Sequence, residues 1–323
     1  MPTGPGVTIF EHRLDSPVGI AAGPLLNSKW IDAYARLGYS LLTYKTVRTA
    51  AQAALPHPNL LHCRPGNPAV VEPAPRPLDP GRVTWAVSIG LPSAEPAEWR
   101  ADVSRAKSRL RPGQMLIVSV VGTPAPGAPQ EQLADDYALC ARWAAEAGAD
   151  AIEVHLSGPN MNAEQQPQMI SESPQLSAYI VDMVRRAVGE RPVLAKLGAT
   201  RSPRALHELA TRLAPRLDGF VLVNGFRQKV AKPDGAQAFP GEHRDVATIV
   251  GAGVYEQCHV QLEELLAWRK AGAWNRVILS VGGLTTAERV ARAIEVGADA
   301  AMVATAALVD PLIATRVSAS LSA

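Results

Sequence analysis

Cysteine is scarce in this sequence, which has only Cys63, Cys140 and Cys258 among its 323 residues. The three lie far apart and form no Cys-x-x-Cys pair, so an iron–sulfur cluster or a structural zinc site built from cysteines of this chain alone is excluded. His57 and His62 come shortly before Cys63, but no complete set of metal ligands follows them. We therefore expect no metal site, and the sparse, odd number of cysteines is typical of a reducing cytosol.

Long apolar runs and long charged runs are also absent. No stretch of about 18 apolar residues occurs, so we expect no membrane span. Residues 1–6 contain neither a basic nor an apolar region, so we expect no signal peptide. The formal net charge is only +2, and no basic run points to nucleic acid. These absences predict a cytoplasmic protein that binds neither membranes nor nucleic acids.

Short apolar segments alternate with amphipathic segments through most of the chain, a pattern that predicts parallel strands and covering helices. Expected strands cover residues 17–23, 41–46, 115–121, 151–157, 192–198, 219–224, 276–281 and 300–304, and expected helices cover 28–37, 130–147, 174–188, 203–214, 260–271, 286–296 and 311–321. Eight such units predict an α/β protein with one domain, a closed (β/α)8 TIM barrel over residues 1–323. An open doubly wound sheet is the alternative, but no Gly-x-Gly-x-x-Gly turn follows the first strand.

Residues 50–80 interrupt this alternation. The segment is rich in proline and has little periodicity. Long loops within a compact domain are usually functional or disordered. We expect this segment to form a lid or an ordered loop over the C-terminal face of the barrel.

Polar residues gather where the fourth expected strand ends, in Glu153-Val-His-Leu-Ser-Gly-Pro-Asn160. Strand alternation places His155 and Ser157 on one side. Gly158 and Pro159 then end the strand and leave Asn160 on the loop beyond it. An ordinary turn explains the stretch taken alone. In a TIM barrel, however, the C-terminal ends of the strands carry the active site.

Other expected strands also place polar residues at their ends: Lys45, Ser119, Lys196 and Asn224. Burying a lysine in an apolar strand is costly without a partner, and strand-end lysines commonly neutralise an anionic ligand. The small residues of Ala21-Ala-Gly23 permit close approach of a flat ligand. Gly282-Gly283, Ala304-Thr305 and the turn at Gly251–Gly253 lie where barrels frequently bind phosphate. A flat ligand over the small residues of the first strand, a lysine at each side and a phosphate site at the last two strands together describe bound FMN.

At this point the sequence resembles the dihydroorotate dehydrogenase family and the related pyrimidine-reducing domain of dihydropyrimidine dehydrogenase. The resembling segments, in family order, are Ala21-Ala-Gly23, Thr43-Tyr-Lys-Thr46, Ser88-Ile-Gly-Leu-Pro92, His155-Leu-Ser-Gly-Pro-Asn160, Ala195-Lys-Leu197, Val223-Asn224, Val281-Gly-Gly283 and Ala304-Thr305. The resemblance implies bound FMN. It implies contacts to the flavin ring or ribityl chain from Ala21, Ala22, Gly23, Lys45, Thr46, Lys196 and Asn224, and to the phosphate from Gly253, Gly282, Gly283, Ala304 and Thr305. Ser119 and His155 join the candidate cofactor-binding residues as strand-end polar groups.

The substrate side departs from the family pattern. The family motif usually reads Asn-x-Ser-Cys-Pro-Asn or Asn-x-Ser-Ser-Pro-Asn, and its Cys or second Ser is the catalytic base. Here Gly158 occupies the base position, His155 replaces the first Asn, and Val87 replaces another substrate-binding Asn. Glycine has no proton acceptor. We therefore expect an FMN-dependent oxidoreductase of the CH–CH or CH–NH type that acts on a small cyclic polar substrate other than dihydroorotate.

Three explanations of the missing base stay open: His155 or a lid residue serves as acid and base, the substrate needs no base there, or flavin is bound with little chemistry. The candidate catalytic residues are Lys45, His155, Ser157 and Asn160. The expected partners are a small-molecule substrate and a soluble electron donor or acceptor, and the resemblance is compatible with a homodimer. Two other classes remain as alternatives: a non-redox TIM barrel that binds a phosphorylated metabolite, with Lys45 or Lys196 as its catalytic cation, and a flavin-binding protein without turnover.

Overall fold

The computed structural model describes residues 6–123, 127–160 and 168–321. Its centre is a closed barrel of eight strands, each parallel to both of its neighbours. In order around the barrel these are β3 (Val18–Ile20), β4 (Leu41–Val47), β8 (Met115–Val120), β9 (Ala151–His155), β12 (Val193–Lys196), β13 (Gly219–Leu222), β16 (Val277–Val281) and β17 (Ala300–Val303). The predicted TIM barrel is confirmed, and each expected strand matches one barrel strand.

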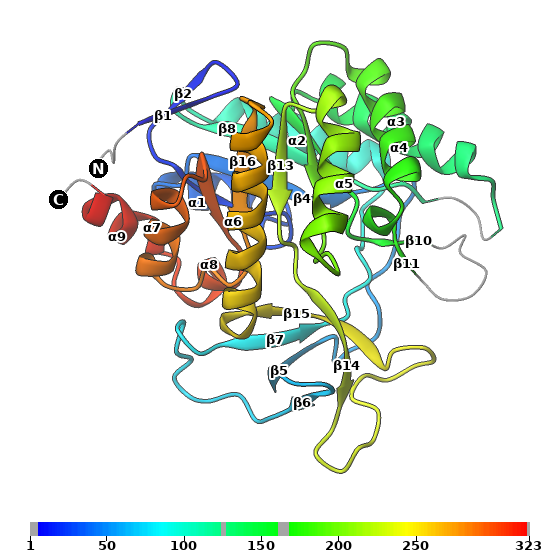
Figure 1. Ribbon diagram of the computed structural model, residues 1–323, viewed down its shortest axis with the longest axis vertical. Coiled ribbons are helices and arrows are strands. Elements are labelled where there is room, and N and C mark those ends of the chain that lie inside the picture. The colour runs from blue at the N-terminus through cyan, green and yellow to red at the C-terminus, as the bar shows by residue number, and fades with distance from the viewer. Residues whose placement is uncertain (1–5, 124–126, 161–167, 322–323) are drawn as a thin grey trace.

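Helices surround the barrel and connect its strands (Figure 1). They are α1 (Ser28–Arg36), α2 (Pro96–Arg109), α3 (Gln130–Glu146), α4 (Pro174–Val188), α5 (Pro203–Leu213), α6 (Tyr255–Ala271), α7 (Ala287–Glu295), α8 (Thr305–Val309) and α9 (Ile313–Leu321), with the 3₁₀ turns η1 (Ile170–Glu172), η2 (Ala214–Arg216) and η3 (Ala252–Val254). Local sequence sets several helix starts. Side-chain oxygens of Asn27, Ser173, Ser202 and Thr286 accept backbone N–H groups of the first turn.

Three helices differ from the sequence prediction, and one of them is the five-residue helix α8, which was not predicted. Helix α2 was not predicted, because only Trp99, Val103 and Ala106 of its residues are buried and the apolar stripe is correspondingly thin. Helix α6 begins at Tyr255 rather than at residue 260. Its first turn carries the polar residues Glu256 and Gln257, so the apolar periodicity becomes visible only later in the helix.

Alternation along the barrel strands separates an inner layer from an outer layer. The inner residues Leu41, Met115, Leu194 and Met302 belong to one buried apolar cluster. The same cluster includes Ile9 and Leu14, from the hairpin of β1 (Val7–Ile9) and β2 (His12–Leu14). Because the cluster contains residues that begin β4 and β8, the hairpin closes the N-terminal end of the barrel. The half of the lumen next to this hairpin is therefore filled by apolar side chains.

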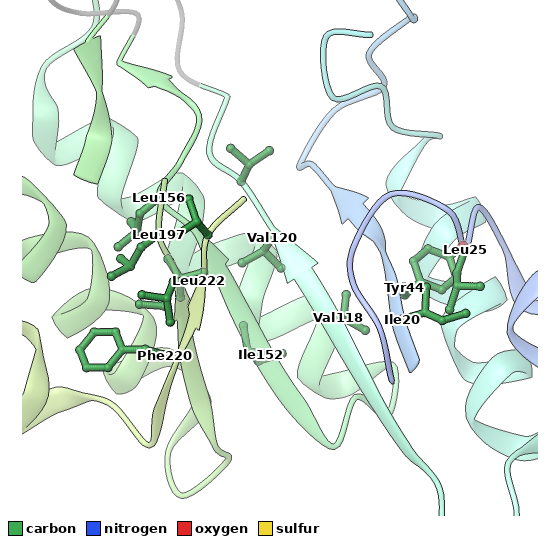
Figure 2. Close-up of a cluster of buried hydrophobic side chains, with 14 of the residues drawn as sticks. Ile20, Leu25, Tyr44, Val118, Val120, Ile152, Leu156, Leu197, Phe220 and Leu222 are labelled. Carbon is green, nitrogen blue, oxygen red and sulfur yellow. The ribbon is translucent and has the colours of Figure 1, made fainter. Parts of the chain in front are cut away.

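The outer layer packs the strands against the helices and forms the larger buried cluster. Figure 2 shows part of it, including Val118 and Val120 of β8, Ile152 of β9, and Phe220 and Leu222 of β13. These residues alternate along each strand with the residues that face the lumen. The alternation therefore fixes which side of each strand faces the helices and which faces the lumen. A one-residue shift in register would expose this whole set to the lumen.

A second, smaller sheet lies at the opposite end of the molecule from the β1–β2 hairpin (Figure 1). Its strands close in the order β14 (Phe226–Ala231), β15 (Val246–Gly251), β7 (Thr84–Val87), β5 (Leu60–Arg64) and β6 (Ala69–Val71). It is inserted after β4 and after β13, so it stands on the C-terminal face of the barrel. This sheet was not predicted.

Residues 50–80 are thus only partly a loop, because they contribute β5 and β6 to the small sheet. The two strands are short and half exposed, and β6 pairs in parallel with β14 far along the chain. No local pattern shows such a pairing. Arg244, which is buried, fastens the segment by donating to the carbonyl oxygens of Pro56 and Ser88 at 3.0 and 2.8 Å.

Candidate active site

The C-terminal end of the barrel brings together polar side chains from adjacent strands. Thr46 at the end of β4 donates from Oγ1 to Ser119 Oγ of β8 at 3.0 Å. Ser157 Oγ lies 3.4 Å from Nε2 of His155, and Lys196 Nζ lies 3.7 Å from Oε1 of Glu153. Side-chain contacts therefore link β4 with β8 and β9 with β12 at this end of the barrel.

His155 is held in the barrel with a neutral ring. Its side chain is buried, and its backbone carbonyl accepts the Tyr137 hydroxyl at 2.8 Å. Burial, together with the positive charges of Lys196, Arg48 and Lys45, holds the pKa of His155 well below its usual value. The ring therefore offers one donor and one acceptor near pH 7. It is poorly suited to deliver a proton, because the protonated form is strongly disfavoured.

Lys45, unlike His155, has a pKa close to neutral pH. Its Nζ donates to the carbonyl oxygen of Pro92 at 2.6 Å, and its side chain is half buried. Burial, and then the nearby Arg48, lower the pKa of Lys45 to about 8. Lys45 is thus the candidate catalytic residue whose protonation changes close to neutral pH.

Arg48 is a residue of this region that the sequence prediction missed. It donates to Leu91 O at 2.9 Å and to Thr123 Oγ1 at 2.7 Å, so it ties together two loops that border the site. Its position three residues after Lys45, just beyond the end of β4, was the available signal. Leu91, which it holds, faces Gly158.

Gly158 could accommodate a side chain. A Cβ atom built there would lie 3.6 Å from His155 Cδ2 and 3.9 Å from Leu91 Cδ1, which are ordinary van der Waals distances. Gly158 is also not among the residues with positive φ. The backbone therefore does not require glycine at this position.

Glu153 is the second residue that the prediction missed. It alternates with His155 along β9 and points into the same lumen, where it is fully buried. Neither of its carboxylate oxygens has a hydrogen-bond partner among the described residues. The signal was present in the sequence, as an acidic residue inside an apolar strand.

Small residues border the site at the end of β3. The amide of Ala21 donates to Val303 O at 3.0 Å, which holds this end beside β17. Ala22 is half exposed, and a Cβ atom built at Gly23 would have no atom within 4 Å. The backbone here faces open space, as a flat ligand would need.

The three predicted phosphate turns lie together. A Cβ built at Gly251 would lie 3.3 Å from Thr305 Cγ2, and one built at Gly283 would lie 2.7 Å from Tyr255 Cβ. The turns before α6, before α7 and at Ala304–Thr305 therefore meet at one place. The amide of Gly253 already donates to Thr84 Oγ1 at 2.9 Å, so its hydrogen bond is used within the protein.

Two predicted residues are less fully placed. Asn224 follows β13, is half buried, and donates its backbone N–H to Leu197 O at 3.0 Å. Asn160 lies in β10 (Pro159–Asn160), which pairs with β11 (Gln168–Met169), and its side chain is outside what the structure describes.

Several buried polar atoms in the barrel lumen have no hydrogen-bond partner within the described part of the chain. They are Thr43 Oγ1, His155 Nδ1 and both carboxylate oxygens of Glu153. Buried polar groups in proteins are almost always paired with protein, water or ligand. Glu153 and His155 lie next to Lys196, and unpaired polar atoms of this kind are what a polar ligand-binding site needs. Together with the glycine turns, the donor set fits a flat heterocycle that carries a phosphate group.

A TIM barrel with polar side chains gathered at its C-terminal face has the arrangement in which barrel enzymes carry their chemistry at strand ends. The family model described as dihydroorotate dehydrogenase matches residues 6–323. The chain belongs to this family.

Individual relatives are distant but align over most of their length. The dihydroorotate dehydrogenase of Dictyostelium discoideum is 26% identical over 327 residues, covering 96% of this chain and 86% of the relative. The dihydroorotate dehydrogenase (quinone) of Bordetella avium (strain 197N) is 26% identical over 298 residues, covering 91% and 77%. That of Stenotrophomonas maltophilia (strain R551-3) is 28% identical over 293 residues, covering 88% and 74%.

The described residues also bear on other classes of site. They contain no group of three or more His, Cys, Asp or Glu side chains arranged to hold a metal ion. Within the same residues, no helix has both the length and the apolar character that crossing a membrane requires.

Proposed function

We propose that this protein is an FMN-dependent oxidoreductase that transfers a hydride between flavin N5 and a small cyclic polar substrate, and that dihydroorotate is not its main substrate. The observation that carries this proposal is the pairing of a lysine-lined barrel mouth and converging glycine turns with Gly158 at the family's base position. FMN, when bound, supplies the hydride chemistry at N5.

The chain offers distinct groups to the two ends of FMN. The ring and ribityl chain would be held by Ala21, Ala22, Gly23, Lys45, Thr46, Ser119, His155, Lys196 and Asn224. The phosphate would be held by the turns that contain Gly253, Gly282, Gly283, Ala304 and Thr305. Lys196 would place a positive charge where negative charge develops during reduction, which is electrostatic stabilisation by a fixed group.

On the substrate side, the residues present favour binding and orientation over strong base catalysis. Neutral His155 can hydrogen-bond a carbonyl or ring nitrogen through Nδ1, which has no hydrogen-bond partner among the described residues. The Lys45 ammonium can neutralise an anionic or carbonyl oxygen. Ser157 and Asn160 would complete the polar lining. A substrate that the enzyme reduces, or one with an acidic proton, suits this set.

Lys45 makes the proposal testable through pH. The Lys45 pKa of about 8 means that the ammonium form dominates below pH 8 and is lost above it. If the ammonium orients the substrate, kcat/KM of the FMN-loaded enzyme falls as pH rises through about 8. We expect this fall to disappear in K45M, which has no titrating group there. A pH profile that is identical in the wild type and K45M would contradict this role.

A substrate screen tests the redox activity itself. The FMN-loaded protein is reduced with light or dithionite under anaerobic conditions and mixed with cyclic imides, pyrimidines, quinones and nicotinamide nucleotides. Quinone is included because relatives carry that word in their names. Rapid reoxidation by one substrate class supports the proposal. Reoxidation by none would favour a flavin-binding protein without turnover.

A further inference from the structure

The buried Glu153–Lys196 pair has a consequence for the redox chemistry of the site. The side chain of Glu153 is 0% exposed and that of Lys196 is 2% exposed, so neither charge reaches solvent. Toward the N-terminal end of the barrel the lumen is apolar, with Ile117 and Ala151 among its residues. Apolar Leu194 lies in register with Glu153 on the neighbouring strand. The pair therefore lies between these apolar residues and the C-terminal mouth of the barrel.

The geometry of the pair is loose. Lys196 Nζ is 3.7 Å from Glu153 Oε1, beyond hydrogen-bond distance, and neither carboxylate oxygen has another partner. Lys196 is in register with His155, whereas Glu153 lies one inward-facing position earlier on β9. The Lys196 ammonium thus lies beside a carboxylate whose backbone position is one inward-facing step farther from the mouth. Among the residues that the structure describes, Glu153 is the one acidic group that forms an ion pair with Lys196.

A buried ion pair is rarely the most stable way to fill such a space, because the desolvation cost can exceed the Coulombic gain. An apolar side chain like those of Ile117 and Ala151 would fill the position of Glu153 without this desolvation cost. Packing therefore does not account for Glu153. Its direct effect is on the charge that Lys196 presents to whatever lies at the mouth.

We propose that Glu153 is a positioning residue for Lys196, and that it lowers the flavin reduction potential by drawing the ammonium back and partly neutralising it. This inference rests on the proposed function, since it requires bound FMN. Lys196 favours the reduced flavin because it opposes the negative charge of that state. Glu153 offsets part of that effect. Removing the carboxylate frees the full positive charge and makes the flavin easier to reduce.

The test is the midpoint potential of the FMN-loaded E153Q variant, measured by equilibration with a reference dye. Glutamine keeps the shape of the side chain and removes its charge. We expect E153Q to raise the equilibrium constant for flavin reduction at least tenfold, which is about 30 mV for a two-electron couple. The matched control is E146Q, which removes the same charge from an exposed ion pair with Arg100. E146Q leaves the potential unchanged.

The potentials of K196M and E153Q/K196M provide a second comparison, which remains available if E153Q does not fold. The double variant leaves no charge of this pair in the lumen. Without Lys196, Glu153 has no ammonium group to position or to neutralise. We therefore expect the two variants to have equal potentials, both below that of the wild type. A folded E153Q with the wild-type potential would overturn the inference, and so would a difference of about 30 mV or more between K196M and E153Q/K196M. Wild-type protein that takes up no FMN overturns the proposed function first, and this inference with it.

Discussion

Replacing Gly158 with cysteine or serine is expected to raise the rate at which dihydroorotate bleaches the bound flavin by about 10²-fold or more, the lower end of what general base catalysis supplies. The family places its base at this position, and here the position has room. A Cβ atom at residue 158 would make only ordinary contacts with His155 and Leu91. The side chain would therefore enter the site without displacing its neighbours. The measurement is anaerobic stopped-flow absorbance with dihydroorotate.

The matched control is G158A, which adds the Cβ atom but no proton acceptor. We expect G158A to behave like the wild type, which bleaches slowly. Adding H155N to G158C restores a second family residue and is expected to raise the rate further. A wild type that bleaches as fast as G158C would show that a base exists elsewhere. Folded, FMN-loaded G158C and G158S that stay as slow as G158A would show that the base is not what this site lacks.

Replacing Gly283 with alanine is expected to abolish FMN retention. Gly283 has φ +71, and a Cβ atom there would overlap the backbone of Tyr255 at the start of α6. The turns before α6 and α7 would have to separate, and these are the turns assigned to the phosphate. Overpacking of this kind costs roughly 1–3 kcal/mol of folding free energy. The measurements are FMN content after purification and the FMN dissociation constant.

Gly189 supplies the control for this substitution. It also has positive φ, +61, but a Cβ atom built there meets nothing within 4 Å. G189A therefore carries the backbone strain of a φ of 61° and a ψ of −129°, roughly 1–3 kcal/mol, without the overlap. We expect G189A to lower thermal stability slightly and to keep FMN. Equal FMN retention in G283A and G189A would contradict the assignment of the phosphate turns.

The barrel could be predicted because its signals are local. Each strand is a short apolar run, and capping residues such as Ser202 and Thr286 precede helices. The small sheet could not be predicted, because its half-exposed strands pair across long sequence distances, β6 with β14 for example. Proline-rich flanks made the same residues look like a loop.

The site shows a similar division. Alternation correctly placed His155 and Lys196 in one lumen, but it applied equally to Glu153, whose charge was overlooked. The sequence could not show that burial and nearby cations keep His155 neutral, or that Arg48 joins two loops. It also could not show that the Gly253 amide is occupied by Thr84. These properties depend on packing between distant segments.

The most direct test of the central claim is the visible absorption spectrum of the purified protein, with and without added FMN. The expected result is a yellow protein with flavin bands that releases FMN on denaturation, or an apoprotein that gains these bands when FMN is added. Protein that shows no flavin bands and takes up no FMN would contradict the flavin assignment. It would favour a non-redox barrel that uses the same glycine turns to hold a phosphorylated metabolite.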